Sequence, residues 1–157
     1  KGQLQRCARA LAGYPDALLV GDFNFDSERN FRPPHDPLEN SALHTHLSGF
    51  DDVWPLLRPG ERGLTFDSEE NPYVRGPEQM RYDRVMARLA SWEPAEIELV
   101  GSAGADGLVD LDRHELSDVL RYLPGGRAPR DGAGAGDARR LFLSDHFGLL
   151  ARFRPRA

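Results

Sequence analysis

Apolar residues near the start of the chain recur first at helical spacing and then as a short continuous run. The helical set occupies positions i, i+3, i+4 and i+7 and comprises Leu4, Cys7, Ala8 and Leu11. This spacing predicts an amphipathic helix. The run at residues 17–20 is typical of a central strand that is covered on both faces. We expect the helix and the strand to form the second half of a β-α-β unit.

A polar, proline-rich stretch and a short helical pattern follow. Residues 26–37 contain three prolines, which predicts a surface loop. We interpret the histidines in and after this loop as solvated or capping side chains: His35, His44 and His46. Apolar positions between residues 50 and 57 are helically spaced and stop before a Pro-Gly pair, so a short helix should bury Trp54. Extended structure should resume at residues 63–67.

Alternating polarity predicts two strands in the middle of the chain. Residues 81–89 alternate, and Asp83 stands at the head of a face that is otherwise apolar. Burying a carboxylate costs several kcal/mol unless it is paired, so Asp83 should have a cationic or hydrogen-bonding partner. The second alternating run covers residues 93–100.

The last third of the chain predicts a helix, a loop and a final strand. An Asp-x-x-Glu capping pattern begins at Asp112 and predicts a helix that ends before a Pro-Gly-Gly sequence. Residues 125–137 are rich in Gly, Ala and Arg, which indicates a flexible loop. The apolar run at residues 148–153 predicts the closing strand.

Length, charge and cysteine content narrow the class of protein. The 157 residues are the length of one domain, and the formal net charge of −5 provides no global basic field, so any contact with nucleic acid must be local. The lone Cys7 excludes an internal disulfide and a cysteine zinc cluster, and it fits a reducing compartment. We therefore expect an intracellular protein, cytoplasmic or nuclear. No apolar run approaches the roughly 18 residues of a membrane span, and no signal peptide is visible.

Three polar clusters lie where predicted strands begin or end. Asp22 and Asn24 follow the first strand and, being two apart, should project from one face, although an Asp-x-Asn turn without chemistry is the alternative. Asp83 starts the second strand, and Asp145 with His146 precedes the last. Hydrolysis of a phosphate ester needs a group that orients or deprotonates water, donors for the charge on phosphorus oxygens, and usually a divalent metal. These clusters could fill those roles, with Asp83 orienting His146.

Four motifs in order carry a resemblance to a known superfamily. They are Gly-Asp-Phe-Asn at residues 21–24, Thr-Phe-Asp at 65–67, Arg-Tyr-Asp-Arg at 81–84 and Ser-Asp-His-Phe-Gly-Leu-Leu at 144–150. In this order they resemble the C-terminal half of the endonuclease/exonuclease/phosphatase superfamily. Within it the chain is most similar to the 5′-tyrosyl-DNA phosphodiesterases. The resemblance implies an α+β fold, a four-layer sandwich of two packed mixed β-sheets flanked by helices, with residues 1–157 as one partial DNase I-like domain.

The resemblance also implies a metal-dependent phosphodiesterase and a role for each catalytic side chain. Asp22 would orient or activate the attacking water, and Asn24 would hydrogen-bond a non-bridging phosphate oxygen. His146 would stabilise the transition-state phosphate and Asp83 would orient His146. Asp145 would contact the water shell of the metal, which we expect to be Mg²⁺, with Mn²⁺ as a substitute.

The same resemblance places three residues on the substrate side of the site. Thr65 would support it, Asn71 belongs to the same group, and Phe66 stands where the DNA-processing relatives usually have a tryptophan. A phenylalanine keeps a stacking face and loses the indole donor. The expected partner is a phosphodiester substrate, DNA 5′ ends, bound by a monomer. A phospholipid headgroup, an inositol phosphate or unmodified DNA is the alternative substrate, and a binding module that has lost catalysis is the non-enzyme alternative.

The catalytic and metal-binding residues that lie in the first half of the superfamily's domain are not found in this chain. Those residues are an Asn and a metal-binding Glu from early strands and a strand of the His-x-Glu-Ser type. The chain begins at Lys1 without a methionine. We therefore expect this chain alone neither to bind magnesium tightly nor to turn over substrate.

Overall fold

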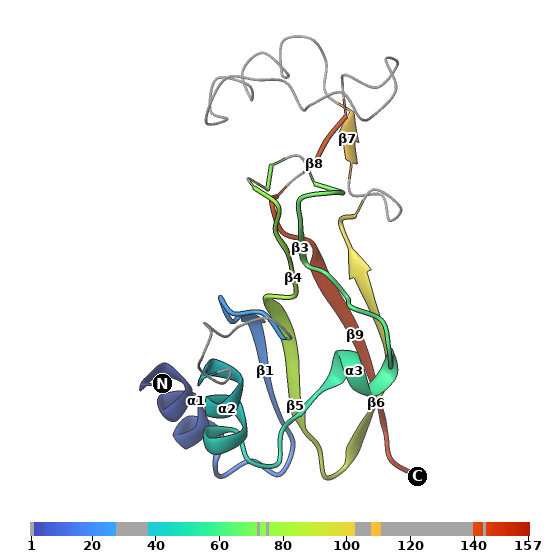
Figure 1. Cartoon of the computed structure of the whole chain (residues 1–157). Helices are drawn as coiled ribbons and strands as arrows, with labels where there is room; N and C mark the ends of the chain where they lie inside the picture. The colour runs from blue at the N-terminus through green and yellow to red at the C-terminus, as the bar shows by residue number, and fades with distance from the viewer. Residues whose placement is uncertain are drawn as a thin grey trace. The chain divides into compact units, whose positions relative to one another are not determined.

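The structure, a computed structural model, combines a few helices with small β-sheets (Figure 1). It describes residues 2–27, 38–71, 73–74, 76–102, 108–110, 140–142 and 144–157. The predicted α+β class is confirmed. The chain divides into two compact units: unit 1 is Lys1–Thr65, Met80–Glu98 and Leu149–Ala157, and unit 2 is Phe66–Gln79 and Leu99–Gly148. The single partial domain over residues 1–157 stays a prediction.

Unit 1 is built on a three-stranded sheet in the order β1-β5-β2. Its strands are β1 (Ala17–Asp22), β5 (Asp83–Arg88) and β2 (Asp51–Asp52). Both pairings are antiparallel, and β1 runs against β5 from the Ala17–Arg88 pair to the Asp22–Asp83 pair. The last residue of β1 therefore lies opposite the first residue of β5.

The first strand is an edge strand in the described part of the sheet, not the central strand that its sequence predicts. Its only neighbour among the described strands is β5. Leu18 and Val20, which share one face, are 44% and 61% exposed. A continuous apolar run shows that a strand has two apolar faces, and it carries no information on whether a second layer covers both of them.

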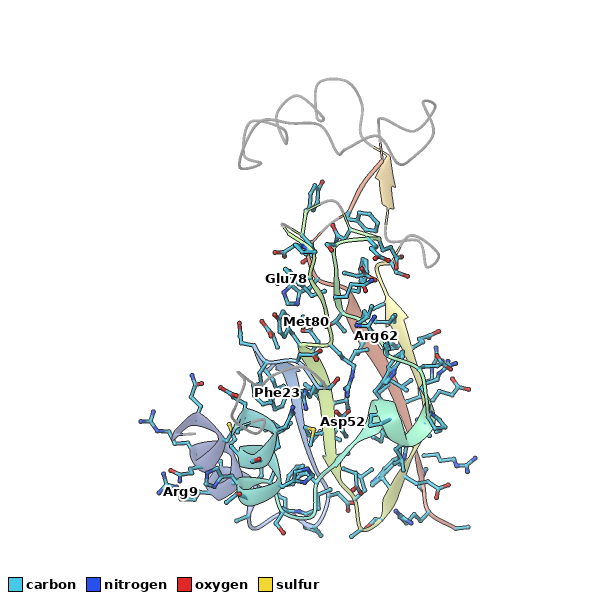
Figure 2. The ribbon with its side chains drawn as sticks, viewed as in Figure 1. Arg9, Phe23, Asp52, Arg62, Glu78 and Met80 are labelled. Atoms are coloured by element: carbon cyan, nitrogen blue, oxygen red, sulfur yellow. The ribbon has the colours of Figure 1, made fainter. Side chains whose placement is uncertain are left out.

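One face of this sheet packs on two helices, α1 (Gly2–Leu11) and α2 (Leu38–His46), which lie side by side next to β1 (Figure 1). The buried members of the cluster are Phe25, Leu43, Leu47 and Met86, and Leu4, Ala8, Leu19, Phe23 and Phe50 pack against them. Phe23 follows β1 directly and points toward this cluster (Figure 2). The predicted first helix and its apolar face are confirmed.

The second helix, α2, was not expected from the sequence. The prolines that precede it favour a loop, yet Ala42 and Leu43 are buried on the helix and Leu47 is buried directly after it. The spacing of Leu43 and Leu47, four residues apart, was the available helical signal. His44 and His46 lie in the last turn, where a cation suits the helix dipole, and His44 is exposed as expected.

The third helix, α3 (Val53–Leu57), confirms the predicted short helix around Trp54 but is shorter than its apolar pattern. Trp54 is buried, and its indole Nε1 donates a hydrogen bond to the carbonyl oxygen of Glu61 at 2.9 Å. Gly63 has φ +61°, and a Cβ built on it would overlap the Trp54 ring. Only glycine satisfies both requirements at this position.

The remaining strands of unit 1 confirm two further predictions. β6 (Trp92–Val100) pairs with β9 (Gly148–Pro155). Exposed ion pairs join them, Arg154 to Glu93 at 2.7 Å and Arg152 to Glu96 at 2.5 Å. Such surface pairs contribute about 0–1 kcal/mol each, so the ladder hydrogen bonds and the burial of Ile97 dominate here.

Unit 2 contains two small ribbons. β3 (Phe66–Asp67) pairs with β4 (Gln79–Met80), and β7 (Leu108–Asp110) runs antiparallel to β8 (Arg140–Phe142). Phe147 is buried, and its ring lies 5.7 Å from that of Phe142.

Three segments predicted from the sequence concern residues that the structure does not describe. The helix that starts at Asp112 and the loop at residues 125–137 lie outside the described residues, as does the 28–37 part of the proline-rich loop. Within the described part of the chain, every helix is too short or too polar to cross a membrane.

Candidate functional site

Two carboxylates predicted from separate motifs are direct cross-strand neighbours. Asp22 ends β1 and Asp83 begins β5, and the two residues are paired in the antiparallel register. Carboxylate oxygens of the two side chains approach within 4.8 Å. Asp22 is exposed and Asp83 is half-buried. Like charges directly opposite each other destabilise a sheet, and a cation bound between the two carboxylates would offset that repulsion.

The residues after Asp22 form a turn instead of continuing the strand. Asn24 has φ +56°, a left-handed conformation that asparagine tolerates well, and its backbone N–H donates to Oδ1 of Asp22 at 2.7 Å. The prediction that Asp22 and Asn24 project from one face of a strand is wrong, because the strand ends at Asp22. The Asp-x-Asn turn holds one carboxylate oxygen of Asp22 and leaves the exposed side chain of Asn24 at the end of the sheet.

Thr65 fixes the backbone that carries Asp83. Its side chain is completely buried, and its Oγ1 accepts hydrogen bonds from the backbone N–H groups of Tyr82 and Asp83, each at 3.1 Å. The N–H of Thr65 donates to the carbonyl oxygen of Met80 at 3.1 Å. The buried hydroxyl thus supports the backbone at Asp83, and the grouping of Thr65 with substrate-binding residues stays a prediction.

Arg81 lies within a buried network of charges that sequence reasoning missed. Its Nη1 donates to both carboxylate oxygens of Asp52, at 3.0 and 2.8 Å. Its backbone N–H donates to Oδ1 of Asp26 at 2.8 Å. Asp52 also caps α3 by accepting the N–H of Trp54 at 3.3 Å. Figure 2 shows Asp52 between α3 and β5. The cap pattern at Asp52 was visible in the sequence, but its partner 29 positions away was not.

Arg84 is the second buried cation beside Asp83. Its Nη2 donates to the carbonyl oxygen of Phe25 at 3.0 Å, and its guanidinium carbon lies 4.7 Å from the centre of the Phe25 ring. Burial lowers the pKa of Arg84 to about 10, and the Asp52 carboxylate, 3.9 Å away, acts in the opposite direction. Within the described part of the chain, its Nε has no hydrogen-bond partner. The two arginines of the Arg-Tyr-Asp-Arg motif therefore anchor the strand, and Asp83 between them is the residue at the sheet end.

His146 belongs to unit 2 and lies in a turn that is held locally. Its backbone N–H donates to Oγ of Ser144 at 3.1 Å, and that hydroxyl lies 3.5 Å from Oδ1 of Asp145. The imidazole packs on Phe66, with ring centres 4.9 Å apart and planes inclined at 54°. Asp145 is exposed, so its carboxylate is accessible to a cation or to the water around one.

Asn71 links two segments of unit 2, and its place among substrate-binding residues stays a prediction. The side chain is completely buried. Its Nδ2 donates to the carbonyl oxygen of Ser144 at 2.8 Å, and its Oδ1 accepts the N–H of Tyr73 at 3.0 Å. Both ends of the amide are therefore engaged by backbone groups of unit 2. No signal in the sequence distinguishes a buried, structural asparagine from one on the surface.

The predicted site residues thus fall into two groups, each held by its own unit. Unit 1 carries Asp22, Asn24, Thr65 and Asp83, and unit 2 carries Phe66, Asn71, Asp145 and His146. A scan against protein-family models and a search of curated proteins each find no match for the chain. The functional conclusion therefore depends on the motifs and on the geometry within each unit.

Proposed function

We propose that the chain is part of a metal-dependent phosphodiester hydrolase that acts on DNA 5′ ends, in the manner of a 5′-tyrosyl-DNA phosphodiesterase. The observation that carries this proposal is the cross-strand pairing of Asp22 with Asp83. The two residues come from motifs far apart in sequence, and the resemblance had assigned them to one site. Opposed carboxylates repel each other, and a bound metal ion would offset that repulsion.

The carboxylate of Asp22 suits a water-activating role. One of its oxygens accepts the N–H of Asn24 at 2.7 Å, which fixes the side chain, and the group is exposed to solvent. A carboxylate fixed in this way can orient a water molecule and accept its proton as the water attacks phosphorus. The exposed amide of Asn24 can donate to a non-bridging phosphate oxygen.

The proposed partner of Asp83 is His146. In the complete site, the Asp83 carboxylate would accept a hydrogen bond from one imidazole nitrogen and leave the other facing the phosphate. The imidazole would then donate to the charge that develops in the transition state. The buried anchors on either side of Asp83, Arg81 and Arg84, support this role because they hold the backbone of the orienting residue.

Exposed carboxylates are ligands that suit Mg²⁺ or Mn²⁺. Asp145 would hold the metal through its water shell, together with ligands from outside this chain. The bound cation would neutralise charge on the phosphoryl oxygens. The chain's own residues would activate the water and donate to the phosphate.

The proposal extends to the layers of the fold and to the cellular compartment. The four-layer sandwich of two packed sheets would cover Leu18 and Val20, which are exposed on β1. We propose that the protein acts as a monomer inside the cell, in the cytoplasm or the nucleus. The lone cysteine supports a reducing compartment.

The test uses the complete protein that contains this chain. Asp22→Asn and His146→Ala should each lower kcat on a 5′-tyrosyl oligonucleotide by roughly 10²- to 10⁴-fold, the usual contribution of a general acid or base. Asp51→Asn, at an exposed carboxylate in the same sheet, is the matched control and should leave turnover unchanged. Near-normal turnover by either site variant would refute the assigned roles.

The alternative substrate class is tested in the same assay. Phe66 stands where DNA-processing relatives usually have tryptophan, and a sphingomyelinase-like enzyme would accommodate this residue as well. A 5′-tyrosyl oligonucleotide, an abasic duplex and sphingomyelin should be compared at equal concentration. Preference for the tyrosyl substrate supports the proposal, preference for the lipid transfers the same chemistry to a headgroup, and hydrolysis of none of them indicates a binding module.

A further inference from the structure

Two contacts join the segment that starts at β3 to the turn that carries His146, and both lie within unit 2. The first is the hydrogen bond from Asn71 Nδ2 to the carbonyl oxygen of Ser144, at 2.8 Å. The second is the packing of the Phe66 ring on the His146 imidazole, with centres 4.9 Å apart. One contact holds the backbone two residues before the histidine, and the other holds the ring itself.

The hydrogen bonds of Asn71 are protected because water does not reach its side-chain amide. The side chain has no exposed surface, and it bridges the N–H of Tyr73 and the carbonyl of Ser144. Removing the amide would take away the hydrogen-bond partner of both backbone groups. The Ser144 carbonyl would then be free to move.

Hydrogen bonds within the turn connect Ser144 to His146. The hydroxyl of Ser144 accepts the N–H of His146 at 3.1 Å, so the backbone on both sides of Asp145 is tied to the same residue. The Phe66 ring then restricts the rotation of the imidazole from the side. Phe147, directly after the histidine, is buried, and its ring packs on that of Phe142.

We propose that Asn71 and Phe66 are positioning residues for His146, in place of the substrate contacts that their motif suggests. This inference rests on the proposed function for the role of His146 in the reaction, and on the geometry of unit 2 for the positioning itself. Asn71 sets the place of the turn and Phe66 sets the plane of the imidazole. Neither residue touches the substrate.

The first experiment observes the imidazole directly, by ¹H–¹³C correlation spectra of the histidine rings in the 157-residue chain. His146→Gln assigns the His146 signals among the five histidines. In the wild-type chain the ring current of Phe66 should displace them from the values of an unstructured histidine. Phe66→Leu should abolish the displacement, and Phe66→Tyr, which keeps the ring, should retain it.

Asn71→Leu, which has a similar volume and no amide, should move the His146 signals while the signals of His44 and His46, in unit 1, stay in place. Unchanged His146 signals in both Phe66→Leu and Asn71→Leu would overturn the inference. If Asn71→Leu does not fold, the comparison of Phe66→Leu with Phe66→Tyr still decides the inference for Phe66.

The second experiment measures kcat and KM in the complete protein. Phe66→Leu and Asn71→Leu should each lower kcat by about ten- to a hundredfold with KM nearly unchanged. A misplaced catalytic group stabilises the transition state less and leaves substrate binding unaffected. Phe66→Tyr should restore kcat. A raised KM with normal kcat in Phe66→Leu would instead mean that Phe66 binds substrate, and would overturn the inference for this residue.

The two experiments separate the two proposals. If the complete protein hydrolyses no phosphodiester, the proposed function fails, and the histidine spectra still show whether Phe66 and Asn71 position the imidazole. If hydrolysis is normal and the spectra do not respond to either variant, the positioning inference fails and the proposed function is unaffected.

Discussion

Replacing Asp52 with asparagine should destabilise unit 1 more than the same replacement at any other partly exposed aspartate that the structure describes. Asp52 accepts two hydrogen bonds from Arg81, lies 3.9 Å from Arg84, and caps α3. The side chains of Arg81 and Arg84 are 6% and 4% exposed, and that of Asp52 is 15% exposed. The substituted asparagine would keep the size and the capping oxygen and lose the charge. Two buried guanidinium groups would then lack their shared anion.

The size of the effect follows from this burial. Breaking a buried ion pair by removing one partner costs about 3–5 kcal/mol, and the small exposure of Asp52 favours the lower end, about 3 kcal/mol. Because asparagine is also a good capping residue, the roughly 1 kcal/mol of the cap should be retained, whereas Asp52→Ala should lose it as well and reach about 4 kcal/mol. For a domain with a total stability of about 5–15 kcal/mol this is a large fraction.

The assay is urea unfolding of the 157-residue chain, followed by circular dichroism. With a slope near 2 kcal/mol per molar urea, the midpoint of Asp52→Asn should fall by about 1.5 M at an unchanged slope. Asp51→Asn, at the exposed neighbouring residue, is the matched control and should stay within about 0.5 kcal/mol of wild type. A loss below about 1 kcal/mol in Asp52→Asn would refute the reasoning, because it would place the pair among ordinary surface pairs.

Three further changes have defined outcomes. In metal-free buffer, Asp22→Asn should stabilise the chain by up to about 1 kcal/mol in urea unfolding, because it removes the cross-strand repulsion with Asp83. Gly63→Ala should destabilise it by about 2–4 kcal/mol in the same assay, since alanine would be strained at φ +61° and would overlap the Trp54 ring. Hydrogen bonds, chiefly from the Ser91 backbone, lower the pKa of Asp16 below its ordinary value of 3.8, so its contribution to stability should be full above that pH and be lost as the pH falls through the lowered value. The stability difference between wild type and Asp16→Ala should therefore disappear in acid.

Each of these changes has a control and a contrary result. Gly60→Ala, at φ +83° with open space around the added Cβ, should cost only the backbone strain of about 1–2 kcal/mol. Equal losses at Gly60 and Gly63 would mean that the Trp54 contact contributes nothing. A destabilised Asp22→Asn would show that the two carboxylates do not repel each other. A difference between wild type and Asp16→Ala that persists far below the ordinary pKa would contradict the role of the carboxylate as a hydrogen-bond acceptor.

The elements that sequence alone predicted correctly are those whose signal is local. The helical spacing of Leu4 and Ala8, and the alternation that includes Ile97, indicate which side of an element faces the core. Leu4 and Ala8 are partly buried against the core cluster, and Ile97 is buried. The second helix was missed because the prolines before it gave a stronger local signal than the spacing of Leu43 and Leu47. Local patterns compete in this way wherever a loop and a helix adjoin.

The candidate site was predictable in its residues and not in its geometry. The motifs identified Asp22 and Asp83, but only the antiparallel register shows that the two carboxylates face each other. The complete burial of Thr65 and Asn71 could not be predicted either, because burial depends on parts of the chain that are distant in sequence. The same is true of Arg81, whose anion Asp52 lies on another strand. A motif identifies which side chains are present, whereas the partners of each side chain depend on the folded structure.

The pairing of Asp22 with Asp83 also makes the site sensitive to insertions in a position-dependent way. Side chains alternate between the two faces of a strand, so a slip of one residue between β1 and β5 would send one carboxylate to the opposite face. An inserted residue within Ala17–Asp22 or Asp83–Arg88 should therefore separate the two groups even where the sheet still forms. The two strands must therefore keep their number of residues, whereas an insertion in a loop between them that spares anchors such as Thr65 and Arg81 leaves the register unchanged.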